Sequence, residues 1–164
     1  MKGYLSLGTN IGDLKANLEI ALNFLKKDKK IKIKAISSYY LTEPIDIQTD
    51  DWFWNLVTHI ETSYSAFQLL NRIQRIEKNM GRINKGDYSS RIIDIDIIAY
   101  EKFIINSDNL VLPHQKMKER LFVLIPLREL YPDWSHPITG EDLDTLIHNV
   151  GNTYKCFKLK KSEV

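Results

Sequence analysis

The sequence predicts an α+β protein with a ferredoxin-like βαββαβ core, an antiparallel sheet and extra helices. Two observations support this fold class. Runs typical of strands and helices occur in the order strand, helix, strand, strand, helix, strand, and both helical segments carry an apolar stripe. Because the 164 residues show no internal repeat and no low-complexity linker, we expect one domain across residues 1–164.

The first half of the core is predicted from residues 3–35. An apolar run at residues 3–7 indicates a strand, and residues 14–25 follow with leucines and an alanine on one helical face. Asp13 stands where a helix-capping side chain is expected. Apolar residues then alternate with Lys32 and Lys34, which is the period-two pattern of a half-exposed strand.

The second half follows the same logic. Residues 55–61 form a strand-like run, and Ser65 with Gln68 three residues later resembles a capping box that opens a helix ending before Gly81. Residues 92–100 are the most strand-like run of the chain. The extra helices are expected at residues 121–131 and 141–150.

Composition limits the classes of function. The chain has 23 Lys and Arg against 21 Asp and Glu, a net charge of +2, so it has no overall charge that favours nucleic acid or membrane as a partner. Cys156 is the single cysteine, which excludes an intrachain disulfide and a cysteine-based zinc site and agrees with a reducing compartment. The first residues contain too short an apolar run for a signal peptide, so we expect a cytoplasmic protein.

The acidic pair Asp94 and Asp96 is the clearest candidate site. Alternation along a strand turns both carboxylates to one side and the neighbouring isoleucines to the other. Two such carboxylates repel each other, and hard oxygen ligands on a strand suit magnesium bound together with phosphates. From spacing alone, an ion pair with Arg91 or Arg82 is an equally good interpretation. The apolar run on both sides favours the metal.

Other candidate residues are ambiguous by themselves. Arg82, Lys85 and Arg91 belong to a polar loop that either binds phosphate or is simply solvated. No P-loop or G-x-G-x-x-G motif is present, so phosphate binding would need another design. The aromatic residues 52–54 either belong to the core or stack on a flat heterocycle whose edge the Asn55 amide would read.

Five segments in the same order resemble the 6-hydroxymethyl-7,8-dihydropterin pyrophosphokinases of folate biosynthesis. They are Leu5 to Asp13, Ser37 to Pro44, Gln74 to Arg82 with Gln74-Arg75-Ile76-Glu77 and Gly81-Arg82, Arg91 to Ile98 with the R-x-x-D-[LIV]-D signature, and Leu112 to Leu127 with the L-P-H-x-x-x-x-x-R pattern. Asn55 stands where the family has its pterin-reading asparagine. The resemblance covers nearly the whole chain.

This resemblance implies an ATP-dependent diphosphotransferase that moves pyrophosphate from ATP to the hydroxymethyl group of 6-hydroxymethyl-7,8-dihydropterin and releases AMP. It implies two Mg²⁺ ions held by Asp94 and Asp96, and catalytic roles for Arg82, Arg91, Asp94 and Asp96. The ATP-binding residues would be Leu70, Gln74, Glu77, Arg82, Arg91, Ile97, Leu110, His114 and Arg120. The pterin-binding residues would be Thr42, Glu43, Pro44, Ile45, Phe53, Asn55 and Phe122. We expect a monomer that acts on these two small molecules.

The chain departs from the family pattern at three places. Tyr88-Ser89-Ser90 replaces a Trp-Gly-Pro run of many members, Phe53 replaces a tyrosine of some members, and Asn84 stands where some relatives have a second loop arginine. Two other readings compete with the pyrophosphokinase. A nucleotidyltransferase with the same acidic pair would attack the α-phosphorus and release pyrophosphate, and an RNA-binding module would need exposed aromatic and basic residues on its central strands.

Overall fold

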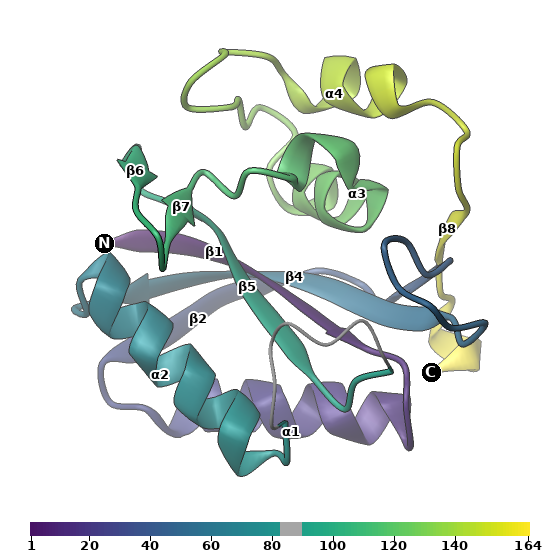
Figure 1. The fold of residues 1–164 in the computed structure, drawn as a ribbon, viewed down its shortest axis with the longest axis horizontal. Coiled ribbons are helices and arrows are strands. Elements are labelled where there is room, and N and C mark those ends of the chain that lie inside the picture. The colour runs from purple at the N-terminus through teal and green to yellow at the C-terminus, as the bar shows by residue number, and fades with distance from the viewer. Residues whose placement is uncertain (83–89) are drawn as a thin grey trace.

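The computed structural model describes residues 1–82 and 90–164. Within these residues, six strands form one antiparallel sheet in the order β5-β1-β4-β3-β8, and β2 pairs with β4 on the same side as β3 (Figure 1). The strands are β1 (Lys2–Thr9), β2 (Ile31–Ile36), β3 (Tyr40–Thr42), β4 (Phe53–Thr62), β5 (Asp94–Tyr100) and β8 (Cys156–Lys158). The long strand β4 therefore joins the two halves of the sheet.

Helices cover both faces of this sheet. The helices α1 (Leu14–Lys27) and α2 (Ala66–Asn79) lie on one face, and α3 (Leu121–Leu130) and α4 (Leu143–Val150) lie on the other (Figure 1). In the described part of the chain, no helix is both long enough and apolar enough to pass through a lipid bilayer.

The predicted fold class is confirmed. The order β1-α1-β2-β4-α2-β5 gives the βαββαβ core, whose sheet order β5-β1-β4-β2 is ferredoxin-like. The sequence did not predict β3, β8 or the small hairpin of β6 (Ile105–Asn106) and β7 (Val111–Leu112), because strands of two or three residues are too short to show a period. Strand β8 joins the same sheet as β1. One domain across residues 1–164 stays a prediction.

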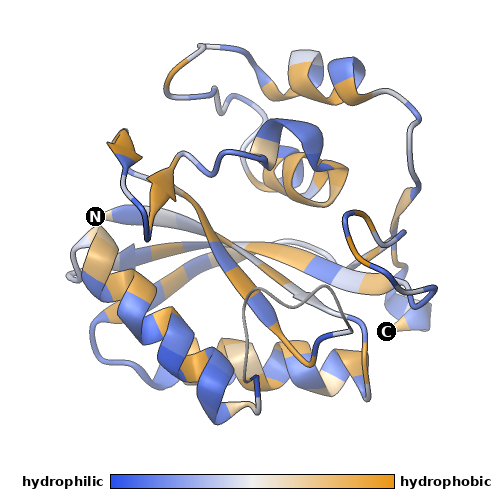
Figure 2. Cartoon of the chain, viewed as in Figure 1, coloured by the Kyte–Doolittle hydropathy of each residue, from blue (hydrophilic) through white to orange (hydrophobic). Residues whose placement is uncertain are grey.

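Two hydrophobic clusters hold the layers together, and apolar residues of the helices turn toward the sheet in Figure 2. The first cluster joins the sheet to α1 and α2, and the second joins it to α3 and α4. Strand β4 serves both, because Leu56 and Ile60 enter the first cluster and Val57 enters the second. This matches the two faces expected from strand alternation.

Local signals explain where the helices of the core begin. The Asp13 carboxylate accepts a hydrogen bond from the Ala16 amide, which caps α1. At α2 the predicted capping box is confirmed: the Ser65 hydroxyl accepts from the Gln68 amide, and the Gln68 side chain accepts from the Ser65 amide. Helix α2 thereby starts at a defined residue and carries its polar side chains to a defined place beside β5.

Candidate active site

The site is built on a row of residues that crosses three strands. In β1, Gly8 lies in register between Asn55 of β4 and Asp94 of β5. One step along, Ser6 lies between Val57 and Asp96. Because side chains of directly paired residues point to the same face of a sheet, the amide and the two carboxylates project from the face that α3 partly covers.

Gly8 is required in this row because of a close approach. A Cβ atom at this position would lie 2.3 Å from Asn55 Oδ1, which is closer than real contacts allow. Asn55 is 3% exposed, and its side chain donates a hydrogen bond from Nδ2 to Thr42 Oγ1 at 2.6 Å. The absence of a side chain at Gly8 therefore lets the Asn55 amide hold one orientation at the floor of a cavity.

The first cavity opens above this amide, and its volume is about 120 Å³. It is lined by Ser6, Gly8, Thr42, Glu43, Ile45, Asp46, Ile47, Phe53, Asn55, Arg91, Asp94, Asp96, Lys116, Arg120 and Phe122. Of the seven residues predicted to bind the pterin, all of which lie in the described part of the chain, Pro44 alone is outside this lining. The other six therefore lie together in one cavity, and their contact with a pterin stays a prediction.

The aromatic residues before Asn55 have three different surroundings. Phe53 lines the first cavity, whereas Trp54 packs against the first hydrophobic cluster and stacks on Tyr39 with ring centroids 5.7 Å apart. Trp52 stacks on Phe157 of β8. Core packing is thus present at Trp54, while stacking of Phe53 on a heterocycle stays a prediction.

Phe122 lies in the first turn of α3, and the hydroxyl of Tyr154 anchors the backbone just before it. The Tyr154 hydroxyl accepts a hydrogen bond from the Leu121 amide and donates to the Glu119 carbonyl at 3.3 Å. Burial raises the pKa of Tyr154 to about 12, so this phenol stays protonated and can make both contacts at neutral pH. The guanidinium of Arg120 lies 5.5 Å from the centre of the Phe122 ring, which places a cation beside the aromatic wall.

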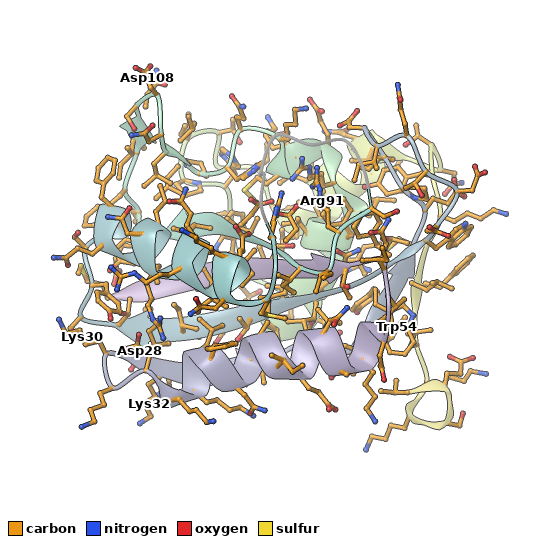
Figure 3. All side chains as sticks on the ribbon, turned by 60° about the horizontal axis from the view of Figure 1, so that its bottom comes forward. Asp28, Lys30, Lys32, Trp54, Arg91 and Asp108 are labelled. Carbon is orange, nitrogen blue, oxygen red and sulfur yellow. The ribbon has the colours of Figure 1, made fainter. Side chains whose placement is uncertain are left out.

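A second cavity of about 230 Å³ lies between α2 and the β6–β7 hairpin. It is lined by Leu70, Gln74, Asp96, Ile97, Asp108, Asn109, Leu110, Val111, His114 and Gln115. Five of these are predicted ATP-binding residues: Leu70, Gln74, Ile97, Leu110 and His114. Figure 3 places Asp108 at the outer end of the hairpin and Arg91 near the middle of the molecule. Asp96 lines both cavities, so its carboxylate lies at the boundary between them.

Basic side chains surround the two carboxylates. Arg82 Nη1 lies 2.5 Å from Asp94 Oδ1, and Arg91 Nη1 lies 2.9 Å from Asp94 Oδ2. Asp96 Oδ2 lies 3.6 Å from Arg120 Nη1 and 3.9 Å from His114 Nε2. The ion pairs that sequence reasoning left open as an alternative are therefore present. They leave each carboxylate about one-fifth exposed and facing a cavity, where a phosphate-bound cation can also meet it.

Glu77 lies behind this face of β5. Its carboxylate is buried and accepts a hydrogen bond from the Ile95 amide at 2.7 Å and from Arg82 Nη1 at 3.3 Å. It thus contacts the strand backbone between the two aspartates and holds the arginine that reaches Asp94. Arg82 also donates to the Ile93 carbonyl at 3.2 Å. The contact of Glu77 with ATP stays a prediction.

Asn10 is a site residue to which the sequence assigned no role. Its side-chain Oδ1 accepts from the Arg91 backbone amide at 2.6 Å, and the Asn10 backbone amide donates to the Arg91 carbonyl at 3.1 Å. The 5% exposed side chain also donates to the Asp51 carbonyl. Asn10 therefore fixes the backbone of Arg91 and ties it to the segment before β4. Its position in the Leu5 to Asp13 segment was a signal, but the partner lies 81 residues away.

Part of the predicted loop lies outside the described residues. This applies to Asn84, Lys85, Tyr88 and Ser89, while Arg82, Ser90 and Arg91 are described. Ser90 contacts Asn10 and Thr49 through its hydroxyl.

Fold and site together define a class of enzyme. A ferredoxin-like sheet presents two carboxylates ringed by arginines between an aromatic, amide-bearing cavity and a second cavity, which is the arrangement of a phosphotransferase that joins two substrates. The sequence model of one family, 7,8-dihydro-6-hydroxymethylpterin-pyrophosphokinase (HPPK), matches residues 4–132. The chain belongs to this family, which confirms the resemblance found in its motifs.

Individual relatives agree with this assignment. The chain is 40% identical over 132 residues to a 2-amino-4-hydroxy-6-hydroxymethyldihydropteridine pyrophosphokinase of Methylorubrum extorquens, covering 80% of this chain and 84% of that protein. It is 34% identical over 141 residues to the protein of the same name in Bacillus subtilis, covering 86% and 84%. It is 41% identical over 162 residues to the folic acid synthesis protein fol1 of Schizosaccharomyces pombe. That match covers 96% of this chain but only 22% of the relative.

The fold is also found in solved structures. A crystal structure of Plasmodium falciparum HPPK-DHPS superposes with a TM-score of 0.75 at 18% identity, covering 90% of this chain and 44% of that one. At this identity the superposition supports the fold rather than the chemistry.

Proposed function

We propose that this chain carries out the reaction for which its family is named. It would transfer a pyrophosphoryl group from ATP to the hydroxymethyl group of 6-hydroxymethyl-7,8-dihydropterin in folate biosynthesis, giving the pterin diphosphate and AMP. The observation that carries the proposal is the position of Asp96, whose carboxylate lines the first and the second cavity at once. A group held over it can pass from a molecule in one cavity to a molecule in the other.

The first cavity suits the pterin. Phe53 and Phe122 would cover the two faces of a flat ring, and the Asn55 amide offers a donor and an acceptor to the ring edge. Thr42 fixes that amide and begins the segment with Glu43, Pro44 and Ile45 that would close around the ring. The volume and the buried amide favour a small aromatic heterocycle over a flexible polar chain.

The second cavity suits the nucleotide. Leu70, Ile97 and Leu110 provide an apolar surface for adenosine, and Gln74 offers a polar side chain beside it. His114, Arg82, Arg91 and Arg120 surround the carboxylates, where they would meet the phosphates. The amide of Lys116 donates to His114 Nδ1 at 3.2 Å, so a neutral His114 carries its proton on Nε2, the nitrogen that faces Asp96.

Magnesium fits this donor set. Within residues 1–82 and 90–164, no group of three or more His, Cys, Asp or Glu side chains is placed to hold a metal alone. Asp94 and Asp96 offer two hard oxygen donors on one face, and Mg²⁺ commonly completes such a pair with substrate phosphates. We propose that these two residues hold two Mg²⁺ ions, which when bound would neutralise developing charge on the phosphates.

In the proposed reaction the hydroxymethyl oxygen attacks the β-phosphorus of ATP. A new oxygen–phosphorus bond forms, the bond from the β-phosphorus to the α,β-bridging oxygen breaks, and AMP leaves with that oxygen while the hydroxyl proton is released. Arg82 and Arg91 would neutralise charge near Asp94, and Arg120 would do so near Asp96, where His114 would donate a hydrogen bond from Nε2. Catalysis would come from positioning and electrostatics.

The decisive experiment identifies the products. The protein is incubated with ATP, Mg²⁺ and the reduced pterin, and the mixture is separated by ion-exchange chromatography. We expect AMP and pterin diphosphate in equal amounts. Pyrophosphate in place of AMP would indicate attack on the α-phosphorus, as in a nucleotidyltransferase, and would overturn the proposal.

We also propose a monomer in the cytoplasm. The single cysteine supports a reducing compartment, and burial raises the pKa of the Cys156 thiol to about 12, which keeps it unreactive. Light scattering behind size-exclusion chromatography checks the monomer, and a mass of two chains would contradict it.

A further inference from the structure

An ion pair crosses the mouth of the first cavity. Lys116 Nζ lies 3.6 Å from Asp46 Oδ2, and both residues line this cavity. Asp46 belongs to the segment that follows β3, whereas Lys116 belongs to the segment between β7 and α3. The pair therefore joins the wall that would hold the pterin edge to the wall that carries His114 and Arg120.

The backbone around Lys116 is well anchored although its side chain is not. The Lys116 amide donates to His114 Nδ1, the Met117 amide donates to the His114 carbonyl at 3.1 Å, and the Met117 side chain is fully buried. The Lys116 side chain is 46% exposed and the Asp46 side chain is 61% exposed. An ion pair this open to water contributes little stability, so it is easily exchanged for a stronger partner.

Asp46 has an uncommon backbone conformation. Its φ of 57° lies in the left-handed region, which is uncommon for residues other than glycine, although aspartate adopts it more often than most. Such backbone conformations cluster at ligand sites.

Lys116 lies on the side of the cavity proposed for the pterin, not on the side proposed for the nucleotide. Its neighbour Gln115 lines the second cavity, whereas Lys116 lines the first, so the chain passes from one cavity to the other between these two residues. The ammonium group is therefore on the pterin side of Asp96. It would meet a phosphoryl group most directly once that group is attached to the pterin.

We infer that Lys116 binds the pyrophosphoryl group after its transfer to the pterin, and that its ammonium leaves Asp46 to do so. The inference rests on the proposed function. A diphosphate carries several negative charges and attracts an ammonium more strongly than the single exposed carboxylate of Asp46 does. Lys116 is thus a product-binding residue, and Asp46 keeps its side chain at the mouth of the cavity before the product forms.

The test compares two ligands that differ only in the diphosphate. Dissociation constants for 6-hydroxymethyl-7,8-dihydropterin and for its diphosphate are measured by isothermal titration calorimetry on wild type, K116M, K116R, K118M and D46N. Lys118 is the matched control, because it lies two residues further on and pairs at 2.7 Å with Glu141. Wild-type formation of AMP is measured in parallel.

We expect K116M to weaken binding of the diphosphate about tenfold, equivalent to about 1.4 kcal/mol, and to change binding of the alcohol less than about twofold. K116R should retain most of the diphosphate affinity, and K118M should change neither ligand. D46N removes the competing carboxylate, so diphosphate binding should be unchanged or tighter.

Two results would overturn the inference while leaving the proposed function intact. Equal weakening of both ligands by K116M and D46N would show that the pair only closes the cavity. Unchanged diphosphate affinity in K116M would show that the ammonium does not meet the product. If wild-type protein forms no AMP with ATP, Mg²⁺ and the pterin, the proposed function and the inference fall together.

Discussion

The two sides of β5 differ although they belong to the same seven residues and the turn before them. On one side Ile93, Ile95 and Ile97 enter the hydrophobic cluster under α1 and α2. On the other side Asp94 and Asp96 are one-fifth exposed and face the cavities. The packed side keeps the strand in place, and this lets the open side hold like charges close together. Stability and chemistry should therefore respond separately to substitutions that are one residue apart.

The largest effect is expected on the open side. We predict that Asp96→Asn lowers kcat by about 10³-fold, because one carboxylate that faces both cavities and is proposed to hold Mg²⁺ is lost. Its free energy of unfolding should stay within about 1 kcal/mol of wild type, since no core volume is removed. Steady-state AMP formation and urea unfolding measure the two quantities. Near-normal turnover at limiting Mg²⁺ would contradict the assignment of this residue.

The packed side should show the reverse. We predict that Ile95→Ala, at a residue with no exposed surface, lowers the free energy of unfolding by about 3 kcal/mol through the cavity it leaves. The matched control is Ile92→Ala. Because Ile92 is 38% exposed, this substitution should lower the free energy of unfolding by less than about 1 kcal/mol. Urea denaturation measures both variants. If the two changes cost the same, the strand does not have the two distinct sides described here.

A substitution in the neighbouring strand should alter one cavity alone. In Gly8→Ala the new Cβ would displace the Asn55 amide, so we predict that affinity for the reduced pterin falls about tenfold or more. Affinity for a non-hydrolysable ATP analogue, measured without pterin, serves as the internal control and should change less than about twofold. A crystal structure of the variant with Asn55 unmoved would show that the close approach is tolerated.

The smallest effect concerns an ion pair on the packed side. Asp28, at the end of α1, accepts from Arg72 Nε at 2.6 Å and lies far from the site, beside Lys30 and Lys32 in Figure 3. Burial acts to raise the pKa of Asp28, but hydrogen bonds from the Lys30 amide, Arg72 and Tyr64 outweigh it, and the pKa is lowered. A lowered pKa stabilises the fold above the ordinary carboxylate pKa, and this contribution is lost as the pH falls through the folded-state value.

We therefore predict that Asp28→Asn costs about 1 kcal/mol at pH 7, and that the difference from wild type shrinks below about pH 4. Urea unfolding at several pH values measures this, and kcat should be unchanged. A difference that stays constant down to pH 2 would mean that the charge of Asp28 contributes nothing.

The elements that sequence reasoning predicted are those with local signals. Helix α2 has an apolar stripe and a capping box within its own residues, and both were visible without any partner. Strand β3 has three residues, and its position depends on β4 and on β8, which comes more than 110 residues later. Such an element is defined by its partners rather than by its own period.

The site divides in the same way. The acidic pair was predicted because i and i+2 on a strand share a side, a rule that needs no tertiary structure. The support of Arg91 by Asn10, the placement of Glu77 behind Arg82 and the approach of Lys116 to Asp46 each join residues from separate elements. No spacing rule could have predicted these contacts, because they depend on how the layers pack.

Among the described strands, β2 lies at an edge of the sheet and carries exposed Lys32 and Lys34 beside the buried Ile31 and the half-buried Ile33 and Ala35. A sheet edge offers unpaired backbone groups to any other extended chain, and lysines at alternate positions discourage such pairing through charge and solvation. Lys34 also pairs with Glu61 at 3.7 Å across to β4. We therefore expect the two lysines to disfavour edge-to-edge pairing of this strand, and replacing both with valine should make the edge more prone to such pairing.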